Sequence, residues 1–244
     1  MRERFRESMN RDELSSLAQI EESHWWFKER RQLLRLWALS FEPSSKFLDI
    51  GAGVGRQSLL LRDELGMQVT AIELSEFGVA ACLDKNLNVI QVNATHLGLP
   101  SESFDAVIAM DVLEHIEEDG EVLNEIERVL KINGTTFITV PCFPFMWSGH
   151  DEAVGHVRRY TKSELVNKIE RSGLSITSVR YWNSLLFPFA IISRFLFRNG
   201  ADLKMPPALL NSFFFYVVSK ERVGSFFGCL PGTSLLITAV KKAK

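Results

Sequence analysis

The sequence predicts an α/β protein with a parallel, doubly wound sheet, and three observations support this prediction. Short apolar runs alternate with longer helical patterns between residues 46 and 141, as expected for strands joined by crossover helices. The first run ends in a glycine-rich turn at residues 51–55 that leads into a helical pattern. The run Phe104–Met110 is apolar almost throughout, which indicates a central strand covered on both faces.

The expected elements follow one another as a βαβαβαβαβ alternation up to residue 141. A helix at 121–130 should stop at residues 131–134, because Gly134 favours a helix end. A helix at 162–171 should begin at Thr161, which with Glu164 resembles a capping box. The sixth strand is expected at 174–182 and the seventh at 235–241. The other expected strands are 47–50, 67–73, 88–92, 104–110 and 135–141, and the other helices are 56–65 and 75–84.

Composition excludes several classes of protein. The chain has 244 residues, 46% of them apolar and 24% charged, which suits one α/β domain with a folded core. Its net charge of −2 gives no general case for a nucleic-acid partner. Cys82, Cys142 and Cys229 fit neither a disulfide framework nor a zinc spacing. Because neither a signal peptide nor an apolar run of about 18 to 20 residues is visible, a cytoplasmic protein is expected.

The glycine turn predicts a site for a nucleoside. Gly51, Gly53 and Gly55 leave bare backbone for a ligand, and the helix behind them presents free N–H groups. A dinucleotide site is the obvious rival, but its fingerprint requires a glycine where this chain has Arg56. Asp49, just before the turn, would repel a pyrophosphate and could pair with an ammonium group. A tight turn without a ligand is the remaining alternative.

The spacing acidic-x-Gly-x-Gly-x-Gly at residues 49–55 resembles motif I of the class I S-adenosylmethionine-dependent methyltransferases. The resemblance covers roughly residues 46–141 and implies a Rossmann-like fold with seven strands, mostly parallel, the last antiparallel. It implies S-adenosylmethionine as cofactor and S-adenosylhomocysteine as product. Glu73 lies about 20 residues after the turn, where a carboxylate can accept both ribose hydroxyls. The family commonly has Asp at the adenine-binding position, where this chain has Asn93. The implied cofactor residues are Asp49, Gly51, Ala52, Gly53, Gly55, Glu73, Leu74, Asn93, Ala94, Asp111 and Val112.

Residues 12–40 read as one or two helices that contain an aromatic run, His-Trp-Trp-Phe at residues 24–27. Consecutive aromatic side chains cannot all face one side of a helix, so some must cover another part of the molecule. They either pack on the main domain or form a lid that shields the cofactor's sulfonium by cation–π contact. The motif HWWFxxRR resembles the N-terminal arm of a bacterial methyltransferase group associated with cell-surface polysaccharide pathways. That resemblance implies cofactor-side roles for Trp26, Phe27 and Arg31.

Polar residues directly follow the central strand. Asp111, Glu114 and His115 should lie at the carboxyl end of the sheet, where open α/β sheets bind ligands. The string MDVLEHI resembles the family segment beside the cofactor's adenosine and sulfonium. A similar acid-x-x-Glu-His string holds a divalent ion in ubiquinone-biosynthesis O-methyltransferases. Because many metal-free relatives share the string, no metal site is predicted.

The loop at residues 142–161, here called the acceptor loop, is dense in functional side chains. Its WSxHDEAxGHxRRYT pattern resembles that of the same bacterial group, where it covers the acceptor side of the cofactor. We expect a general base at His150 or His156, with Asp151 orienting a histidine and His115 in reserve. The two adjacent arginines would suit a phosphate or pyrophosphate. A structural loop whose polar groups bond one another is the alternative. The expected acceptor contacts are Trp147, Arg158, Arg159, Tyr160 and His115.

Some fifty residues separate the sixth and seventh strands. Residues 183–244 hold eight Lys or Arg against two Asp or Glu, and the insert at 183–232 holds nine of the eighteen phenylalanines. Residues 185–197 are apolar nearly all round if helical, yet too few to span a bilayer. The insert is either a helical cap buried on the domain or a surface that touches a membrane or holds a lipid tail.

These observations divide the chain into an N-terminal arm or lid (1–42), a methyltransferase core (43–182), the insert (183–232) and a last core strand (233–244). They favour O-methylation of a saccharide or lipid-linked intermediate by a cytoplasmic protein at the inner face of a membrane. The second hypothesis is a methyltransferase for a soluble small molecule, as in ubiquinone pathways, and the third is a non-catalytic cofactor-binding protein. The acceptor, the methylated atom and the oligomeric state stay open.

Overall fold

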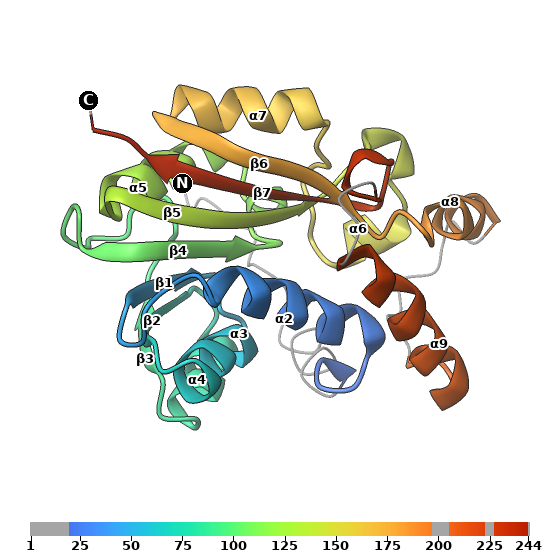
Figure 1. The fold of residues 1–244 in the computed structure, drawn as a ribbon, viewed down its shortest axis with the longest axis horizontal. Helices are drawn as coiled ribbons and strands as arrows, with labels where there is room; N and C mark the ends of the chain where they lie inside the picture. The colour runs from blue at the N-terminus through green and yellow to red at the C-terminus, as the bar shows by residue number, and fades with distance from the viewer. Residues whose placement is uncertain (1–19, 197–204, 223–226, 244) are drawn as a thin grey trace, which may run out of the picture.

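One seven-stranded sheet with helices on both faces organises the computed structural model, which describes residues 20–196, 205–222 and 227–243 (Figure 1). The strand order is β3-β2-β1-β4-β5-β7-β6. The pairs from β3 to β5 are parallel, whereas β7 runs antiparallel to both β5 and β6. The predicted doubly wound sheet with an antiparallel last strand is therefore confirmed. The strands are β1 (Lys46–Ile50), β2 (Gln68–Glu73), β3 (Asn88–Gln91), β4 (Phe104–Met110), β5 (Leu130–Pro141), β6 (Leu174–Trp182) and β7 (Ser234–Lys241).

The helices begin where the sequence offers caps. Ser75 accepts a hydrogen bond from Gly78 N at the start of α4, and Thr161 accepts one from Glu164 N at the start of α7. The α-helices are α2 (Trp25–Ala38), α3 (Arg56–Leu59), α4 (Glu76–Leu83), α5 (Asp119–Val129), α6 (Gly149–Ala153), α7 (Lys162–Arg171), α8 (Phe187–Leu196) and α9 (Ala208–Ser219). The π-helix η1 (Leu60–Glu64) continues α3, and 3₁₀ turns occur at η2 (Leu113–His115), η3 (Pro144–Met146), η4 (Lys220–Arg222) and η5 (Phe227–Cys229).

Two predictions about the connections are wrong. Residues 131–134 do not close a helix: α5 ends at Val129 and β5 begins at Leu130, with a register shift where Gly134 lies. The alternation also lacks a helix between β3 and β4, where residues 92–103 form a loop. Side chains of α5 hold that loop, since Arg128 donates to Leu99 O at 2.6 Å and Glu125 accepts from Leu97 N at 2.7 Å. The predicted structure of residues 12–19, and that of residue 197 at the end of the predicted apolar helix, lies outside the described residues.

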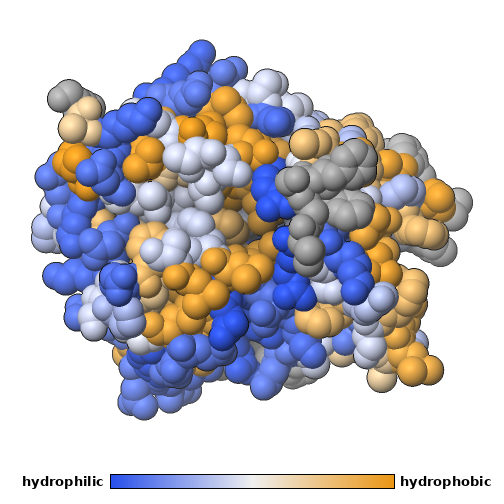
Figure 2. All heavy atoms as spheres, viewed as in Figure 1, coloured by the Kyte–Doolittle hydropathy of each residue, from blue (hydrophilic) through white to orange (hydrophobic). Residues whose placement is uncertain are grey.

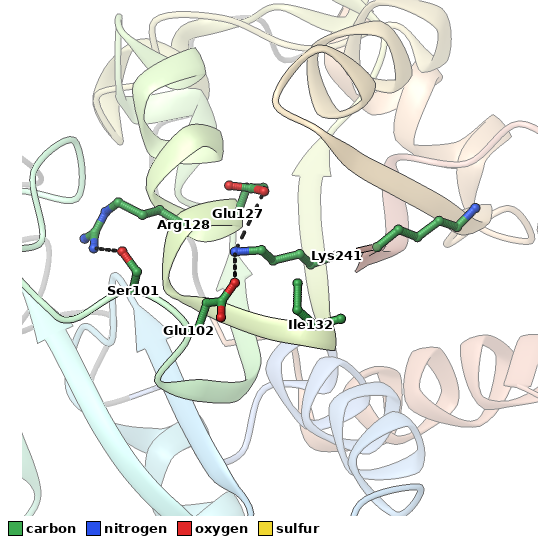
Figure 3. Close-up of a pocket in the computed structure, with 7 residues that line it drawn as sticks. Ser101, Glu102, Glu127, Arg128, Ile132 and Lys241 are labelled. Atoms are coloured by element: carbon green, nitrogen blue, oxygen red, sulfur yellow. Dashed lines mark hydrogen bonds and ion pairs between the residues drawn. The ribbon is translucent and has the colours of Figure 1, made fainter. Parts of the chain in front are cut away.

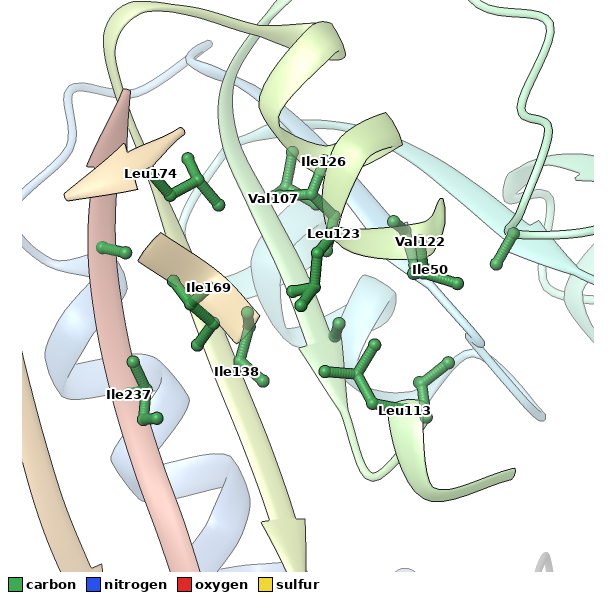
Figure 4. Packing of buried hydrophobic residues seen from close by; sticks show 14 of the residues in the cluster. Ile50, Val107, Leu113, Val122, Leu123, Ile126, Ile138, Ile169, Leu174 and Ile237 are labelled. Carbon is green, nitrogen blue, oxygen red and sulfur yellow. The ribbon is translucent and has the colours of Figure 1, made fainter. Parts of the chain in front are cut away.

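Alternating strand residues build two separate cores, one on each face of the sheet. On one face, Val107 and Ala109 of β4 pack with Val122 and Ile126 of α5 and with the apolar side of α7 (Figure 4). On the other face, Ala106, Ile108 and Met110 pack under α2 and η1. This alternation is why a strand buried on both faces reads as an unbroken apolar run.

The N-terminal arm and the insert pack against each other. Trp182, Leu186 and Val218 form a cluster with Trp25 and Trp26 of α2. Polar contacts join the same elements: Asn211 of α9 accepts from Trp25 N at 2.8 Å, and Arg222 pairs with Glu29 at 2.8 Å. Among the described residues, no helix is both long and apolar enough to cross a membrane.

A hollow of about 350 Å³ lies at the end of the sheet away from the glycine turn (Figure 3). Its lining includes Lys241, which pairs with Leu174 at the start of β6 and lies 3.5 Å from Glu102 and 3.8 Å from Glu127. Lys241 is thus neutralised by Glu102 and Glu127, and none of the predicted site residues lines the hollow. The lining residues are Ser101, Glu102, Glu127, Arg128, Ile132, Lys241 and Lys242.

Candidate active site

The turn at residues 51–55, here called the cofactor turn, has the backbone that the glycines allow. Gly51 and Gly53 have φ values of +69° and +55°, a region that other residues avoid. A Cβ at Gly51 would lie 2.6 Å from Val112 Cγ2, so the turn packs directly on the segment after β4. No atom lies within 4 Å of a Cβ built at Gly53. This bare, open backbone fits the close approach of a ligand.

Glu73 at the end of β2 is joined to the cofactor turn. Its Oε2 accepts from Gly53 N at 2.8 Å, and its Oε1 accepts from Leu74 N at 3.0 Å and Ser75 N at 2.8 Å. Because β1 and β2 are paired in parallel, with Ile50 opposite Ile72, their carboxyl ends meet at this point. The structure therefore brings the predicted ribose-binding carboxylate beside the predicted glycine turn.

Asp49 lies beneath the cofactor turn and is buried. Its Oδ2 accepts a hydrogen bond from Ser58 Oγ at 2.6 Å. Burial raises the pKa of Asp49 to about 7, and the charge of Glu73 adds to the effect, while the Ser58 hydrogen bond opposes it. Such a carboxyl is ready to ionise when a cation arrives, as the ammonium group of the expected cofactor would.

Asp111 occupies the switch from β4 to the η2 segment with φ +56°. Its Oδ1 accepts from Thr139 Oγ1 at 2.8 Å, and its Oδ2 pairs with Arg30, which also donates to Thr139 Oγ1 at 2.9 Å. The resemblance predicted Arg31 on the cofactor side, whereas Arg30 is the arginine that contacts Asp111 at the end of β4. Arg31 instead donates to the carbonyls of Glu21 and Glu22.

The spacing of residues in α2 could have predicted that Arg30 faces the sheet. Arg30 lies four residues before Leu34 and eight before Ala38, so all three share the buried face of α2.

The two aromatic residues predicted on the cofactor side have different neighbours. Trp26 packs on Trp182 with ring centroids 4.4 Å apart, whereas the ring of Phe27 lies 5.9 Å from that of His24.

The loop after β3 completes the cofactor side. Asn93 Oδ1 accepts from Thr95 N at 3.0 Å, which shapes a local turn. Ala94 and Val112 are buried, while Leu74 is exposed beside Glu73. Apart from those of the arm, the predicted cofactor residues therefore lie at, or directly after, the carboxyl ends of β1, β2, β3 and β4.

Asp151 is the centre of the acceptor loop and is fully buried. Its Oδ1 lies 2.8 Å from His156 Nδ1 and accepts from Arg159 Nε at 2.7 Å, and its Oδ2 accepts from Arg194 at 2.9 Å. Burial alone would raise the pKa of Asp151, but hydrogen bonds from His156 and Arg159 and the charges of both arginines hold it well below its usual range. Arg194 belongs to α8, so the insert contributes directly to this centre, which the sequence analysis did not predict.

His156 and the η2 segment meet across the sheet end. The rings of His115 and His156 are 4.7 Å apart, and Val157 N donates to Glu114 O at 2.8 Å. Burial and the neighbouring His156 lower the pKa of His115 to about 4, whereas burial and the charge of Asp111 raise that of Glu114. His150 lies half-buried in α6, one residue before Asp151. The predicted pairing of Asp151 with a histidine thus occurs with His156.

Two of the predicted acceptor contacts have internal partners instead. Tyr160 is fully buried, and its hydroxyl donates to Asp119 at 2.7 Å and contacts Leu113 O at 3.1 Å. Arg159 is buried between Asp151 and the Cys142 carbonyl. These side chains hold the loop in place, and their contact with the acceptor stays a prediction. Arg158 pairs with Asp119 at 2.9 Å, and Trp147 donates to Glu152 at 3.3 Å.

A comparison with protein families supports the identity that this geometry indicates. The family described as a methyltransferase domain matches residues 48–138, which begin within β1 and end within β5. Residues 48–138 therefore form a methyltransferase domain of the class I S-adenosylmethionine-dependent type. S-adenosylmethionine is the methyl donor of this domain type, and the open backbone at Gly53 and the buried carboxyl of Asp49 fit it.

Its relatives differ in what they methylate. A probable S-adenosylmethionine-dependent methyltransferase of Mycobacterium tuberculosis is 25% identical over 162 residues, 65% of this chain and 58% of that protein. Phosphoethanolamine N-methyltransferase 2 of Caenorhabditis elegans is 30% identical over 107 residues, 41% of this chain and 24% of that protein. A demethylmenaquinone methyltransferase of Listeria welshimeri is 28% identical over 132 residues, 50% of this chain and 54% of that protein. The matches cover less than two thirds of each relative.

Solved structures share the fold of this methyltransferase. The [4+2]-cyclase SpnF has a TM-score of 0.64 at 22% identity, with 90% of this chain and 83% of that chain covered. A putative methyltransferase of Haloferax volcanii, solved with the Trm112 activator, has a TM-score of 0.63 at 19% identity, with 96% and 100% covered. At these identities the likeness concerns the fold alone.

Proposed function

We propose that this protein transfers the methyl group of S-adenosylmethionine to an oxygen of a saccharide or lipid-linked acceptor. The observation that carries the proposal is the Asp151–His156 hydrogen bond of 2.8 Å at the ligand-binding end of the sheet. When bound, the cofactor supplies a methyl group on a positively charged sulfur, and the acceptor oxygen that gains this methyl group must lose a proton. A histidine held in place by a carboxylate is suited to promote that loss.

The hydrogen-bond partners define the state of His156. Asp151 is a carboxylate of low pKa, which only accepts hydrogen bonds, so Nδ1 of His156 must carry the proton. The lone pair of a neutral His156 is then on Nε2, which faces Glu114 and lies near His115. Proximity and exclusion of water would supply the rest of the rate acceleration.

The test is methyl transfer from isotopically labelled S-adenosylmethionine to lipid and aqueous extracts of the protein's own cells. We expect His156→Ala to lower the labelling rate by about 10² to 10⁴-fold while leaving cofactor affinity nearly unchanged. His96→Ala is the matched control, since His96 is exposed in the loop after β3. Full activity of the His156→Ala protein would refute the assignment. Absence of any labelled product, with cofactor bound, would favour a non-catalytic protein.

The insert favours a lipid-linked acceptor. Leu209, Phe213 and Tyr216 are spaced along one face of α9 and are 89%, 56% and 59% exposed. On α8, Phe189 and Ile192 are also exposed, and Figure 2 shows apolar side chains gathered at the edge where Figure 1 places α8 and α9. An exposed apolar face of this kind commonly marks an interaction site.

Two further contacts relate this face to the acceptor. Lys220 lies over the ring of Tyr216 at 4.2 Å, which puts a positive charge beside the apolar stripe, as an anionic lipid surface would require. Arg194 joins α8 to Asp151, so the same helix reaches both the exposed face and the proposed catalytic pair. A lipid-linked substrate could therefore be held by its tail and its head group together.

Sedimentation with vesicles separates this acceptor class from a soluble one. We expect the protein to sediment with phosphatidylglycerol-containing vesicles at low salt, and a Leu209→Ser, Phe213→Ser double variant to lose this binding. Leu83→Ser is the control, since Leu83 is 57% exposed but belongs to α4. If the parent protein does not sediment, and the label enters only the aqueous extract, the acceptor is a soluble small molecule.

A further inference from the structure

Glu114 is a buried acid without a hydrogen-bond partner among the described residues. Its side chain is 0% exposed, and neither carboxylate oxygen accepts a hydrogen bond. The Nε2 atom of His156 lies 3.9 Å from Oε1, too far for a hydrogen bond. A buried carboxylate in this state is strongly unfavourable unless it is neutralised, paired or bound to a cation.

Two imidazoles stand beside this carboxylate, and each has a further polar neighbour. His156 uses Nδ1 to bond Asp151 at 2.8 Å, and the backbone of Gly155 lies beside the His115 ring and favours its charged form. In protein metal sites, the ligating histidine usually donates its other ring N–H to a carboxylate or a backbone carbonyl. The potential ligand atoms of Glu114, His115 and His156 all lie within 4.8 Å of one another.

We propose that Glu114, His115 and His156 bind a divalent transition-metal ion. Two imidazole nitrogens and one carboxylate oxygen suit Zn²⁺, Mn²⁺, Fe²⁺ or Co²⁺, whereas Mg²⁺ and Ca²⁺ prefer oxygen ligands throughout. With ligand bonds of about 2.0 to 2.2 Å, the three atoms must move closer together when the ion binds. Three protein ligands leave further coordination positions for water or a substrate oxygen.

This ligand set differs from the one that the string Asp111-x-x-Glu114-His115 would give. Asp111 is paired with Arg30 and accepts from Thr139 at 2.8 Å, so its carboxylate is already neutralised by a cation from the arm. The third ligand comes instead from the acceptor loop, about 40 residues later in the chain. Only the folded structure brings His156 to the η2 segment.

A metal ion at this place would also have a role in the proposed methyl transfer, and this role rests on the proposed function. The ligands Glu114 and His115 follow Val112 by two and three residues, and Val112 packs on the cofactor turn. A bound cation lowers the pKa of a hydroxyl that coordinates it. In the metal-bound protein the lone pair of His156 Nε2 would be used as a ligand, so His156 could not take the acceptor's proton. The ion would lower the pKa of the acceptor hydroxyl, and its proton would pass to a water molecule.

The experiment is a titration of the chelator-treated, dialysed full chain with Co²⁺, read by calorimetry and by visible d–d absorption. It uses neither cofactor nor acceptor, so its result is independent of whether methyl transfer is found. We expect one Co²⁺ per chain. Glu114→Gln and His156→Ala should each weaken binding at least about tenfold, and Asp151→Asn by about 10 to 100-fold through the orientation of His156. Asp111→Asn should weaken binding far less than Glu114→Gln does, and the surface control His96→Ala should bind as the parent does.

Thermal unfolding of the same proteins distinguishes loss of a ligand from loss of the fold. Glu114→Gln removes a buried carboxyl that accepts no hydrogen bond, so without metal it should melt at a temperature at least as high as the parent's. Adding Co²⁺ should raise the melting temperature of the parent but not that of Glu114→Gln. Equal Co²⁺ affinity in the parent and in Glu114→Gln would overturn the proposal. So would binding that is lost in Asp111→Asn and kept in His156→Ala.

Discussion

The cofactor side and the acceptor side of this site are held by different kinds of contact. On the cofactor side, Gly53 and Glu73 meet through backbone N–H groups at the ends of two paired strands. On the acceptor side, buried Asp151 is bound by Arg159 and Arg194, the second of which comes from the insert. The first arrangement depends on strand register and the second on long side chains from distant segments. The acceptor side should therefore be the more sensitive to single charge changes.

The most severe test of this comparison is Asp151→Asn. The variant leaves Arg159 and Arg194 buried without their counter-charge, so we expect about 3 to 5 kcal/mol less stability at pH 7 and a large loss of turnover. Because the folded-state pKa of Asp151 is lowered, its stabilisation is present above the unfolded value of 3.8 and is lost as pH falls below it. Denaturant unfolding at neutral and acidic pH measures both effects. A difference that does not shrink in acid would contradict the charge-based account.

Glu73→Gln tests the cofactor side at its most polar residue. Loss of a charged acceptor for the ribose hydroxyls should weaken S-adenosylmethionine binding by about 10 to 100-fold. Because the amide nitrogen of Gln cannot accept the backbone N–H groups that Glu73 accepts, stability should also fall by about 1 to 3 kcal/mol. Calorimetric titration provides the measurement. The matched control is Glu76→Gln, because Glu76 is exposed on the first turn of α4. Equal affinity in the two variants would mean that Glu73 does not hold the ribose.

Gly53→Ala tests the backbone on the same side. Gly53 and Gly66 both have positive φ, and neither has an atom closer than 3.8 Å to an added Cβ. Each alanine variant should lose about 1 to 2 kcal/mol of stability through its left-handed backbone. Only Gly53→Ala should also weaken cofactor binding, since its Cβ would occupy the open face of the cofactor turn. Affinity lost equally in both variants would show that the effect is not local.

The smallest effect concerns the pH dependence of cofactor binding. An ammonium group near Asp49 would favour its ionised form, so affinity should rise as pH increases from about 6 to 8, by at most about tenfold, with proton release on binding. For the cofactor-free protein, the raised pKa of Asp49 favours the folded state at low pH, and that contribution is lost as pH rises through about 7. Titrations in buffers of different ionisation enthalpy, with Asp49→Asn as comparison, measure the proton release. If the parent releases no proton when the cofactor binds, Asp49 does not pair with the ammonium group.

The sequence predicted what short-range patterns determine. The apolar run of β4, the caps at Ser75 and Thr161 and the glycine turn are local features, and the structure confirms each. The choice between Arg30 and Arg31, and the burial of Arg159, depend on which face of an element meets another element. The spacing of residues along a helix predicts which side chains share a face, as it does for Arg30 and Leu34, but it does not predict which element that face contacts. The link from Arg194 to Asp151 spans 43 positions and had no sequence signal.

That link has a consequence for protein engineering. Exchanging residues 183–232 between related enzymes would be a natural way to graft a new acceptor preference onto the same core. In this chain the exchanged piece would include Arg194, one of the two arginines that neutralise Asp151. A chimera would therefore keep a well-ordered acceptor loop only if the incoming segment also delivers a cation at that place. The insert is best treated as part of the enzyme's polar core rather than as an interchangeable module.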